Sequence, residues 1–373
     1  MKRLFAIFLT IVTVFSVSVF RVDSVNLSGT LALSAKSAVL IDCESHSILY
    51  SKDHDAKMGM ASTTKIMTAL VAAESTDLKR TVVVSPEAVG VEGSSVYLYE
   101  GERITIEELL YALLLQSAND AAEAIAIAVA GSVGAFADMM NARAAQMGLK
   151  NTHFTNPHGL SDDEHYTTAH DLAVITAHAL KNETLRTIVS TYKKSIPIDS
   201  DCNPRLLVNH NKMLKLYDGA IGVKTGFTKT TGRCLVSAAE REGLTVIAVT
   251  LDAPDDWNDH KKLLDFGFDN YESLLVAEAG SFIYPLSVVG GDEPFVSLTN
   301  TQDIRLTVPK IRGELKCKIE TLHRFEFAPI LRGTDAGSVT YSYEGMSSSS
   351  SALVCAENIG ISKKQTKENQ WNQ

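Results

Sequence analysis

Three short motifs in the chain hold the residue types that serine-based acyl transfer requires. They are Ser62-x-x-Lys65, Ser117-x-Asn119 and Lys224-Thr225-Gly226. Residues three apart share one face of a helix, so the Lys65 amine could take the hydroxyl proton of Ser62 and make it a nucleophile. A lysine base must be neutral when it acts, and burial with a second nearby cation would lower its pKa from about 10.4. Free N–H groups at the start of that helix would favour the negative charge that develops on the substrate oxygen.

The other two motifs supply the remaining groups for such a reaction. The hydroxyl of Ser117 could relay a proton, and the amide of Asn119 could hold a substrate carbonyl. A glycine at position 226 lets a substrate backbone approach closely, and an edge strand there could bind an extended peptide by strand addition. Lys224 and Thr225 would then meet a terminal carboxylate.

Each motif is weak by itself. Ser190-x-x-Lys193 repeats the first pattern in surroundings that suggest no chemistry, and Ser24-x-Asn26 repeats the second. Alone, a Ser-x-x-Lys is more typical of a helix cap, a Ser-x-Asn of a corner between helices, and a Lys-Thr-Gly of a strand end. The three in this order, each on an element that can face one cleft, favour a serine acyl-transferase with Ser62 as its nucleophile.

The hydrophobic pattern places these motifs in an α+β domain. Thr105 and Glu108 have capping-box spacing before one apolar helix, and Asp120 and Glu123 repeat that spacing before the next. An early hairpin is expected to join the strands beyond Gly222 in one sheet. The expected elements are a hairpin over residues 38–50, helices from about 62, 105 and 120 and over 136–147, 168–180 and 255–266, and paired strands over 234–236 and 244–251.

The length and composition suggest two domains. The chain has 373 residues, 45% of them hydrophobic, which is enough for one large core and a smaller second domain. Short β-type runs follow residue 275, and from Gly345 a run of five serines and a polar end predict disorder. The expected organisation is a signal peptide and leader over residues 1–34, a catalytic domain over 35–275, a small all-β domain over 276–345 and a disordered tail over 346–373.

The first residues predict export. Lys2 and Arg3 precede 17 uncharged residues, Leu4 to Phe20, as in a secretory signal. Cleavage after Ser24 or after Ser34 would suit small-residue preferences, and an uncleaved membrane anchor is the alternative. Both alternatives place the rest of the chain outside the cytoplasm.

Charge and cysteine content argue against several classes of function. The net charge of −9 disfavours nucleic-acid binding and adhesion to anionic lipid by charge alone. The odd number of cysteines leaves at least one unpaired, and the absence of a Cys-x-x-Cys pair excludes a thiolate metal knuckle. Most are expected to be small apolar core residues. The five are Cys43, Cys202, Cys234, Cys317 and Cys355.

A group of histidines raises the alternative of a zinc hydrolase. It contains no His-Glu-x-x-His or comparable spacing, so it is more typical of a polar loop and helix start, and no metal or cofactor is expected. The Gly-x-Ser-x-Gly of a triad hydrolase is also absent from the sequence. The group consists of His153, His158, His165 and His170 with Asp162 and Asp163.

The motifs and their flanks resemble the low-molecular-weight penicillin-binding proteins, the D-alanyl-D-alanine carboxypeptidases of the peptidase S11 family. The resemblance covers about residues 36–340. It implies a β-lactamase/transpeptidase-like α+β domain followed by a small β domain, in agreement with the pattern described above. Beyond the three motifs it rests on residues 61–70, 156–160, 165–166, 168–172, 209–212 and 222–228.

This resemblance implies a role for each candidate residue. Ser62 would form the acyl-enzyme with Lys65 as its general base, Ser117 would shuttle a proton, and Asn119 would orient the substrate. Lys224 would bind the terminal carboxylate and help to keep Lys65 neutral.

Residues 225–227 complete the implied substrate site. Thr225 would assist Lys224, and Gly226 would let the substrate approach. The N–H groups of Ser62 and Phe227 would form the oxyanion hole. Some relatives carry histidine where Phe227 stands; only the backbone is needed there, so a changed substrate preference is implied rather than a loss of activity.

The implied substrate is a peptidoglycan stem peptide ending in D-Ala-D-Ala. Attack would release the last D-alanine, and water would then free the enzyme. β-Lactam antibiotics would acylate Ser62 as substrate mimics. Many relatives end in an amphipathic anchor helix, whereas residues 363–373 carry one aromatic residue and no apolar face, so membrane attachment through the C-terminus stays open.

Two alternatives share these motifs. A class A β-lactamase would need a second base, commonly a glutamate between the second and third motifs; Glu164 and Glu183 lie there without the expected surroundings, and the extra β domain also counts against it. A non-catalytic penicillin-binding sensor is the other alternative, and the intact motifs argue against it.

Overall fold

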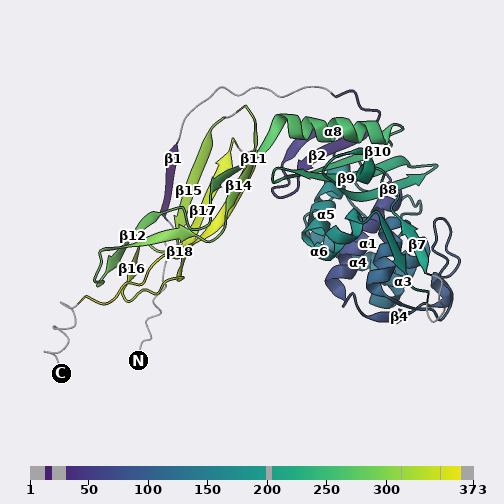
Figure 1. Ribbon diagram of the computed structural model, residues 1–373, viewed down its shortest axis with the longest axis horizontal. Helices are drawn as coiled ribbons and strands as arrows, with labels where there is room; N and C mark the ends of the chain where they lie inside the picture. Colours follow the sequence, from purple (N-terminus) through teal and green to yellow (C-terminus); the bar gives the residue numbers. More distant parts are fainter. Residues whose placement is uncertain (1–12, 19–30, 199–203, 312, 345, 363–373) are drawn as a thin grey trace, which may run out of the picture. The chain divides into compact units, whose positions relative to one another are not determined.

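The computed structural model in Figure 1 describes residues 13–18, 31–198, 204–311, 313–344 and 346–362. The chain divides into two compact units, one of Ser28–Asp269 and one of Asn270–Gln373 together with Met1–Leu27. The expected boundary after residue 275 is therefore six residues too late. The reason is that β11 (Tyr271–Ala277) pairs with β14 (Ile304–Pro309) and so belongs to the second unit.

A five-stranded antiparallel sheet forms the centre of the first unit, in the order β3-β2-β10-β9-β8. The early hairpin thus joins the late strands, as predicted. The sheet lies between α8 on one face and α5 on the other (Figure 1). The bounds are β2 (Ser37–Asp42), β3 (Ile48–Lys52), β8 (Ala220–Thr228), β9 (Gly232–Arg241), β10 (Leu244–Leu251), α5 (Ala169–Lys181) and α8 (Asp256–Asn270).

Helices fill the rest of this unit around one apolar core. The helix α1 is buried from Lys65 to Ala72, so its start lies deep inside the protein. The remaining elements are the 3-10 turns η1 (Ala61–Thr64) and η2 (Pro86–Ala88), α1 (Lys65–Ser75), α2 (Ile106–Leu115), α3 (Asn119–Ala130), α4 (Val133–Gln146), α6 (Glu183–Ser190), α7 (Met213–Leu216), β4 (Thr81–Val83), β5 (Arg103–Thr105), β6 (Lys193–Ile196) and β7 (Arg205–Val208).

The two predicted capping boxes have different outcomes. Thr105 and Glu108 cap α2 as predicted, with the Glu108 N–H donating to Thr105 Oγ1 at 3.2 Å and the Thr105 N–H donating to Glu108 Oε2 at 2.9 Å. The second box is wrong, because α3 begins at Asn119 and has no side-chain cap. The Asp120 carboxylate instead accepts the N–H groups of Val96 and Leu98 from an earlier loop.

The second unit is all-β, as expected. Its main sheet has the order β1-β15-β17-β18-β13-β12-β16, and only the β12–β16 pair is parallel. The bounds are β1 (Thr13–Ser18), β12 (Tyr284–Val289), β13 (Phe295–Asn300), β15 (Leu315–Thr321), β16 (Phe325–Phe327), β17 (Asp335–Tyr343) and β18 (Ser347–Cys355).

The disordered tail predicted from residue 346 is wrong for its first part. The serine run Ser347–Ser351 lies in β18, whose backbone pairs with β17 and β13, and such pairing does not depend on side-chain polarity. Three hydroxyls of the run are used inside the unit: Ser347 donates to Thr307 O at 2.8 Å, Ser351 accepts the N–H of Thr301 at 3.1 Å, and Ser350 Oγ lies 2.8 Å from Thr340 Oγ1. Residues 363–373 lie outside the described part of the chain.

Part of the expected export segment is also described. Thr13–Ser18 form β1, which pairs with β15 at the edge of the all-β sheet. Residues 1–12 and 19–30 lie outside the described residues, so cleavage stays a prediction. In the described residues no single helix is long and apolar enough to cross a membrane, although α3 and α4 together, bent by 82° at their junction, meet the length and composition criteria.

Candidate active site

Ser62 lies in the 3-10 turn that leads into α1, and Lys65 is the first residue of that helix. In a 3-10 turn the side chains at i and i+3 eclipse, which aligns the two residues more closely than a regular α-helix does. Lys65 Nζ lies 3.1 Å from Ser62 Oγ. The Lys65 side chain is fully buried, whereas Ser62 is partly exposed, so the hydroxyl faces the solvent side with the amine behind it.

Ser117 and Asn119 lie at the corner between α2 and α3 and point to two different amines. Ser117 Oγ accepts a hydrogen bond from Lys224 Nζ at 3.0 Å, and Asn119 Oδ1 accepts one from Lys65 Nζ at 2.7 Å. Ser117 has a φ of +60°, a left-handed conformation that non-glycine residues adopt rarely and that often marks functional sites. The corner therefore presents its polar side chains to the Ser62 motif.

Lys224 to Phe227 lie on β8, the last strand of the sheet, which leaves one side of that strand free of sheet pairing. Lys224 is 1% exposed and also donates to Thr225 O at 2.7 Å, whereas the Phe227 side chain is 64% exposed. A Cβ on Gly226 would lie 3.0 Å from Ser62 N and 3.1 Å from Met60 O. Only glycine therefore lets β8 come this close to the backbone of Ser62.

Burial sets the charge of both lysines. The pKa of Lys65 lies well below its ordinary value, mainly because the amine is desolvated and secondly because Lys224 is near, against a smaller opposing effect of Asp120. Burial alone lowers the pKa of Lys224 to about 7. Among the described residues, Lys65 Nζ hydrogen-bonds to uncharged oxygens of Ser62, Asn119 and His158 and to no carboxylate that would hold it protonated.

The described structure thus brings the five residues together as two neighbouring hydrogen-bonded groups, Ser62 with Lys65 and Asn119, and Ser117 with Lys224. Gly226 lies directly against Ser62, and Thr225 and Phe227 lie beside Gly226 on β8.

The segment of residues 156–160 is a part of the site to which the sequence motifs gave no role. His158 O accepts a hydrogen bond from Lys65 Nζ at 2.5 Å. Gly159 has a φ of +88°, and a Cβ there would lie 1.9 Å from Ala61 O, so this loop packs against the turn that carries Ser62. In the sequence, the turn-forming run Asn156-Pro157-His158-Gly159 indicated a loop here but not its contact with Lys65.

A second missed contribution comes from the loop between η2 and β5. Glu92 O accepts a hydrogen bond from Asn119 Nδ2 at 2.6 Å, which fixes which way the amide faces. A Cβ on Gly93 would lie 2.7 Å from the same nitrogen. Backbone oxygens carry no residue-type signal, so neither this contact nor that of His158 could be predicted from a motif.

The histidine group has structural partners instead of a zinc site. His165 Nε2 lies 2.8 Å from Thr64 Oγ1, and its Nδ1 accepts the Thr155 N–H at 3.1 Å. Burial lowers the pKa of His165 to about 4 and that of His158 to about 3, so both are neutral at pH 7. Within the described part of the chain no cluster of three or more His, Cys, Asp or Glu side chains could hold a metal ion.

The glutamates that a β-lactamase would need as a second base are at the surface. The side chain of Glu164 is exposed in the loop that carries Asp162, and that of Glu183 is exposed in the first turn of α6. The cysteines that the structure describes are free thiols, and burial raises the pKa of Cys43 and Cys234 to about 12. Cys202 lies outside the described residues.

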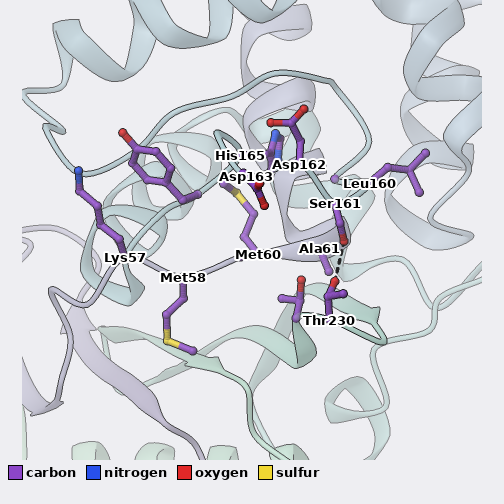
Figure 2. A pocket seen from close by; sticks show the side chains of 14 residues that line it. Lys57, Met58, Met60, Ala61, Leu160, Ser161, Asp162, Asp163, His165 and Thr230 are labelled. Carbon is purple, nitrogen blue, oxygen red and sulfur yellow. Dashed lines mark hydrogen bonds between the residues drawn. The ribbon is translucent and has the colours of Figure 1, made fainter.

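A pocket of about 440 Å³ adjoins the turn that carries Ser62 (Figure 2). Its walls are the segment Lys57–Ala61, the loop Gly159–Tyr166 without Glu164, and Thr230 with Thr231 beyond the end of β8. Ser161 Oγ and Thr230 Oγ1 lie 2.8 Å apart and join the second wall to the third (Figure 2). The pocket thus begins where Ala61 precedes Ser62 and where β8 ends.

Comparison with known proteins agrees with this geometry. Residues 24–255 match the family model described as D-alanyl-D-alanine carboxypeptidase, Peptidase_S11, and residues 271–360 match that of the penicillin-binding protein 5 C-terminal domain. The chain is 32% identical to the D-alanyl-D-alanine carboxypeptidase DacF of Bacillus subtilis over 96% of this chain and 95% of that protein.

Solved structures give the same result. Penicillin-binding protein 5 of Haemophilus influenzae superposes with a TM-score of 0.72 at 30% identity, covering 89% of this chain and 99% of that one. A mutant of the Streptomyces K15 DD-transpeptidase superposes with a TM-score of 0.62 at 32% identity, covering 64% of this chain and 100% of that one. The chain belongs to the peptidase S11 family of D-alanyl-D-alanine carboxypeptidases.

Proposed function

We propose that this chain is a serine D-Ala-D-Ala carboxypeptidase that removes the terminal D-alanine from peptidoglycan stem peptides and is acylated by β-lactams. The observation that carries the proposal is the buried Lys65 amine, held 3.1 Å from Ser62 Oγ with a depressed pKa. A neutral amine in this place is a general base for the serine hydroxyl. Family membership supplies the substrate class.

The acylation step follows from the contacts. Lys65 takes the hydroxyl proton as Ser62 Oγ attacks the carbonyl carbon of the penultimate D-alanine. The N–H groups of Ser62 and Phe227 stabilise the oxyanion, and the closeness of Gly226 to Ser62 N is consistent with this pairing. The proton that Lys65 took then passes through Ser117 to the leaving amine, so that Lys65 is neutral again, and the terminal D-alanine departs as the acyl-enzyme forms.

The second half of the reaction reverses the first. Water attacks the ester carbonyl, gives its proton to Lys65, and releases the shortened peptide while Ser62 regains its hydrogen.

The Lys224 ammonium, with Thr225, binds the terminal carboxylate of the incoming peptide. We assign the orientation of the peptide backbone to Asn119, whose amide is itself held by Lys65 and by Glu92 O.

The bound peptide has a direction in this arrangement. If its carboxylate is at Lys224 and its reacting carbonyl at Ser62 and Phe227, the preceding residues continue past Thr228, the last residue of β8. The pocket in Figure 2 lies there, with Thr230 and Thr231 in its wall. We assign it to the upstream part of the stem peptide. Peptides extended at the N-terminus should have a lower KM than the acylated dipeptide, and an unchanged KM would refute this assignment.

The proposal is tested by incubating the wild type and Ser62→Ala with a peptide ending in D-Ala-D-Ala and measuring free D-alanine. Release by the variant at the wild-type rate would refute the mechanism. An added amine acceptor separates hydrolysis from peptide transfer, since transfer yields a cross-linked product in place of the shortened peptide. Fast turnover of a chromogenic cephalosporin, as against slow stoichiometric labelling, would instead identify a β-lactamase.

We also propose that the enzyme acts outside the cytoplasm. The support is the uncharged segment Leu4 to Phe20 after Lys2 and Arg3. Fractionation of cells that produce the full chain, followed by N-terminal sequencing, would give the compartment and the mature start. Recovery in the cytoplasm would contradict the proposal.

A further inference from the structure

The surroundings of Lys65 Nζ decide where its lone pair points. The amine contacts Asn119 Oδ1 at 2.7 Å, His158 O at 2.5 Å and Ser62 Oγ at 3.1 Å. Amide and carbonyl oxygens only accept hydrogen bonds, whereas a hydroxyl can also donate one. A neutral amine has two N–H groups, which therefore go to Asn119 and His158. Its lone pair is then left facing the hydroxyl of Ser62.

The carbonyl of His158 is thus one of the two acceptors that orient Lys65 Nζ. The imidazole of the same residue is held in one tautomer. The N–H of Leu160 donates to His158 Nδ1 at 3.2 Å, so this nitrogen accepts. The neutral ring then carries its hydrogen on Nε2. That atom lies 3.4 Å from Glu123 Oε1.

Glu123 lies one turn after Asn119 on α3, on the same face of the helix. The helix therefore reaches Lys65 twice, directly through Asn119 and indirectly through Glu123 and His158. The Glu123 side chain is only 18% exposed, and burial raises its pKa. The sequence spacing indicated a capping role with Asp120, but α3 has no side-chain cap, which leaves Glu123 without that role.

We propose that Glu123 is a positioning residue for the general base. Its carboxylate faces His158 Nε2 at 3.4 Å and so anchors the residue whose carbonyl accepts one N–H of Lys65. This inference rests on the proposed role of Lys65 and extends it to a residue outside the three motifs.

Glu123→Ala and Glu123→Gln test this inference, because the glutamine side chain keeps an acceptor oxygen opposite His158 Nε2 and alanine does not. The rate of acylation by a fluorescent penicillin is measured from pH 5 to 10, together with kcat and KM for a D-Ala-D-Ala peptide. Glu183→Ala is the matched control, since Glu183 is an exposed glutamate on another helix of the same unit.

We expect Glu123→Ala to lower the acylation rate and kcat about tenfold, or about 1.4 kcal/mol, with KM nearly unchanged. The rising limb of the pH profile of acylation in Glu123→Ala should move to higher pH, because a loosened loop admits water and lessens the desolvation of Lys65. Glu123→Gln and Glu183→Ala should behave as the wild type. A wild-type rate and pH profile in Glu123→Ala would overturn the proposal, and so would a loss that glutamine does not rescue.

A readout without turnover separates this inference from the proposed function. The pKa of Lys65 can be followed by NMR of lysine labelled at Cε, with Lys65→Met to assign the signal. The pKa should rise in Glu123→Ala and not in Glu123→Gln, even if the wild type released no D-alanine. An unchanged pKa in Glu123→Ala would refute the positioning role.

Discussion

The catalytic unit contains two Ser-x-x-Lys sequences, and their surroundings differ in every respect that matters for chemistry. At the first, Ser62 is partly exposed while Lys65 is fully buried and contacts it at 3.1 Å. At the second, Ser190 ends α6 and donates its hydroxyl back to the helix carbonyl Arg186 O at 2.9 Å. Lys193 lies exposed on β6, beyond the end of that helix.

The difference lies in distant parts of the chain. Lys65 is surrounded by oxygens that come from Asn119 and His158, and its pKa is lowered by burial and by Lys224. The serine of the second sequence has its bonds within its own helix. The Ser-x-x-Lys spacing alone therefore does not identify a base or a nucleophile. Burial of the lysine and a second amine near it distinguish the first sequence from the second.

Loss of the base should have the largest effect. Lys65→Met should reduce acylation by a fluorescent penicillin about 10²- to 10⁴-fold, the usual contribution of a general base. Lys193→Met should leave it unchanged, because that side chain is exposed on β6. Stopped-flow labelling of both variants measures the contrast, and equal rates would show that the first sequence is no more catalytic than the second.

Disturbing the close approach of β8 to the turn that carries Ser62 should have the second-largest effect. In Gly226→Ala the new methyl group would lie 3.0 Å from Ser62 N and 3.1 Å from Thr63 N, so β8 must move away from the nucleophile's turn. We expect a loss of about 10²-fold in kcat, comparable to removing one oxyanion donor. Gly134→Ala is the control, because nothing lies within 4 Å of a Cβ there. Equal kcat values in the two variants would contradict the role of Gly226.

The two buried amines predict opposite limbs in the pH profile of kcat/KM. Lys65 acts when neutral, so its depressed pKa places the rising limb well below the ordinary lysine range. Lys224 is proposed to bind the carboxylate in its charged form, and its pKa of about 7 should make binding weaken as pH rises through that value. Above it kcat/KM should fall about tenfold per pH unit.

Lys224→Arg isolates the falling limb. Arginine stays protonated throughout this range, so the fall should disappear even if the overall rate is lower. A falling limb that survives in this variant would mean that another group controls it.

The smallest effect should come from the second Ser-x-x-Lys itself. Ser190→Ala removes a hydroxyl that bonds only within α6, to Arg186 O and Thr187 O among the described contacts. We expect unchanged D-alanine release and a change of about 0.5 kcal/mol or less in the free energy of unfolding, followed by urea denaturation. A measurable loss of activity would remove the contrast between the two sequences.

Local patterns were predictable where the interaction is local. The capping box of Thr105 and Glu108 joins residues three apart, and it forms as the sequence indicates. Asp120 has the same spacing to Glu123, but its partners are the N–H groups of Val96 and Leu98, more than twenty residues away in the chain. Spacing cannot reveal such a competing partner.

Two further limits have the same physical cause. Composition predicted disorder for the serines from Ser347, but a strand needs only backbone partners, which β17 and β13 supply. The motifs identified the side chains of the site, whereas the carbonyls of His158 and Glu92 are backbone groups that any residue could provide. Only the folded chain shows that these oxygens fix Lys65 and Asn119.

The identity of the acylated residue tests the account most directly. Intact-protein mass spectrometry after incubation with benzylpenicillin should show one adduct per chain, and peptide mapping should place it on Ser62. Ser62→Ala should remain unmodified and Ser190→Ala should be modified as the wild type. An adduct on Ser190, or an adduct that persists in Ser62→Ala, would contradict the assignment of the nucleophile.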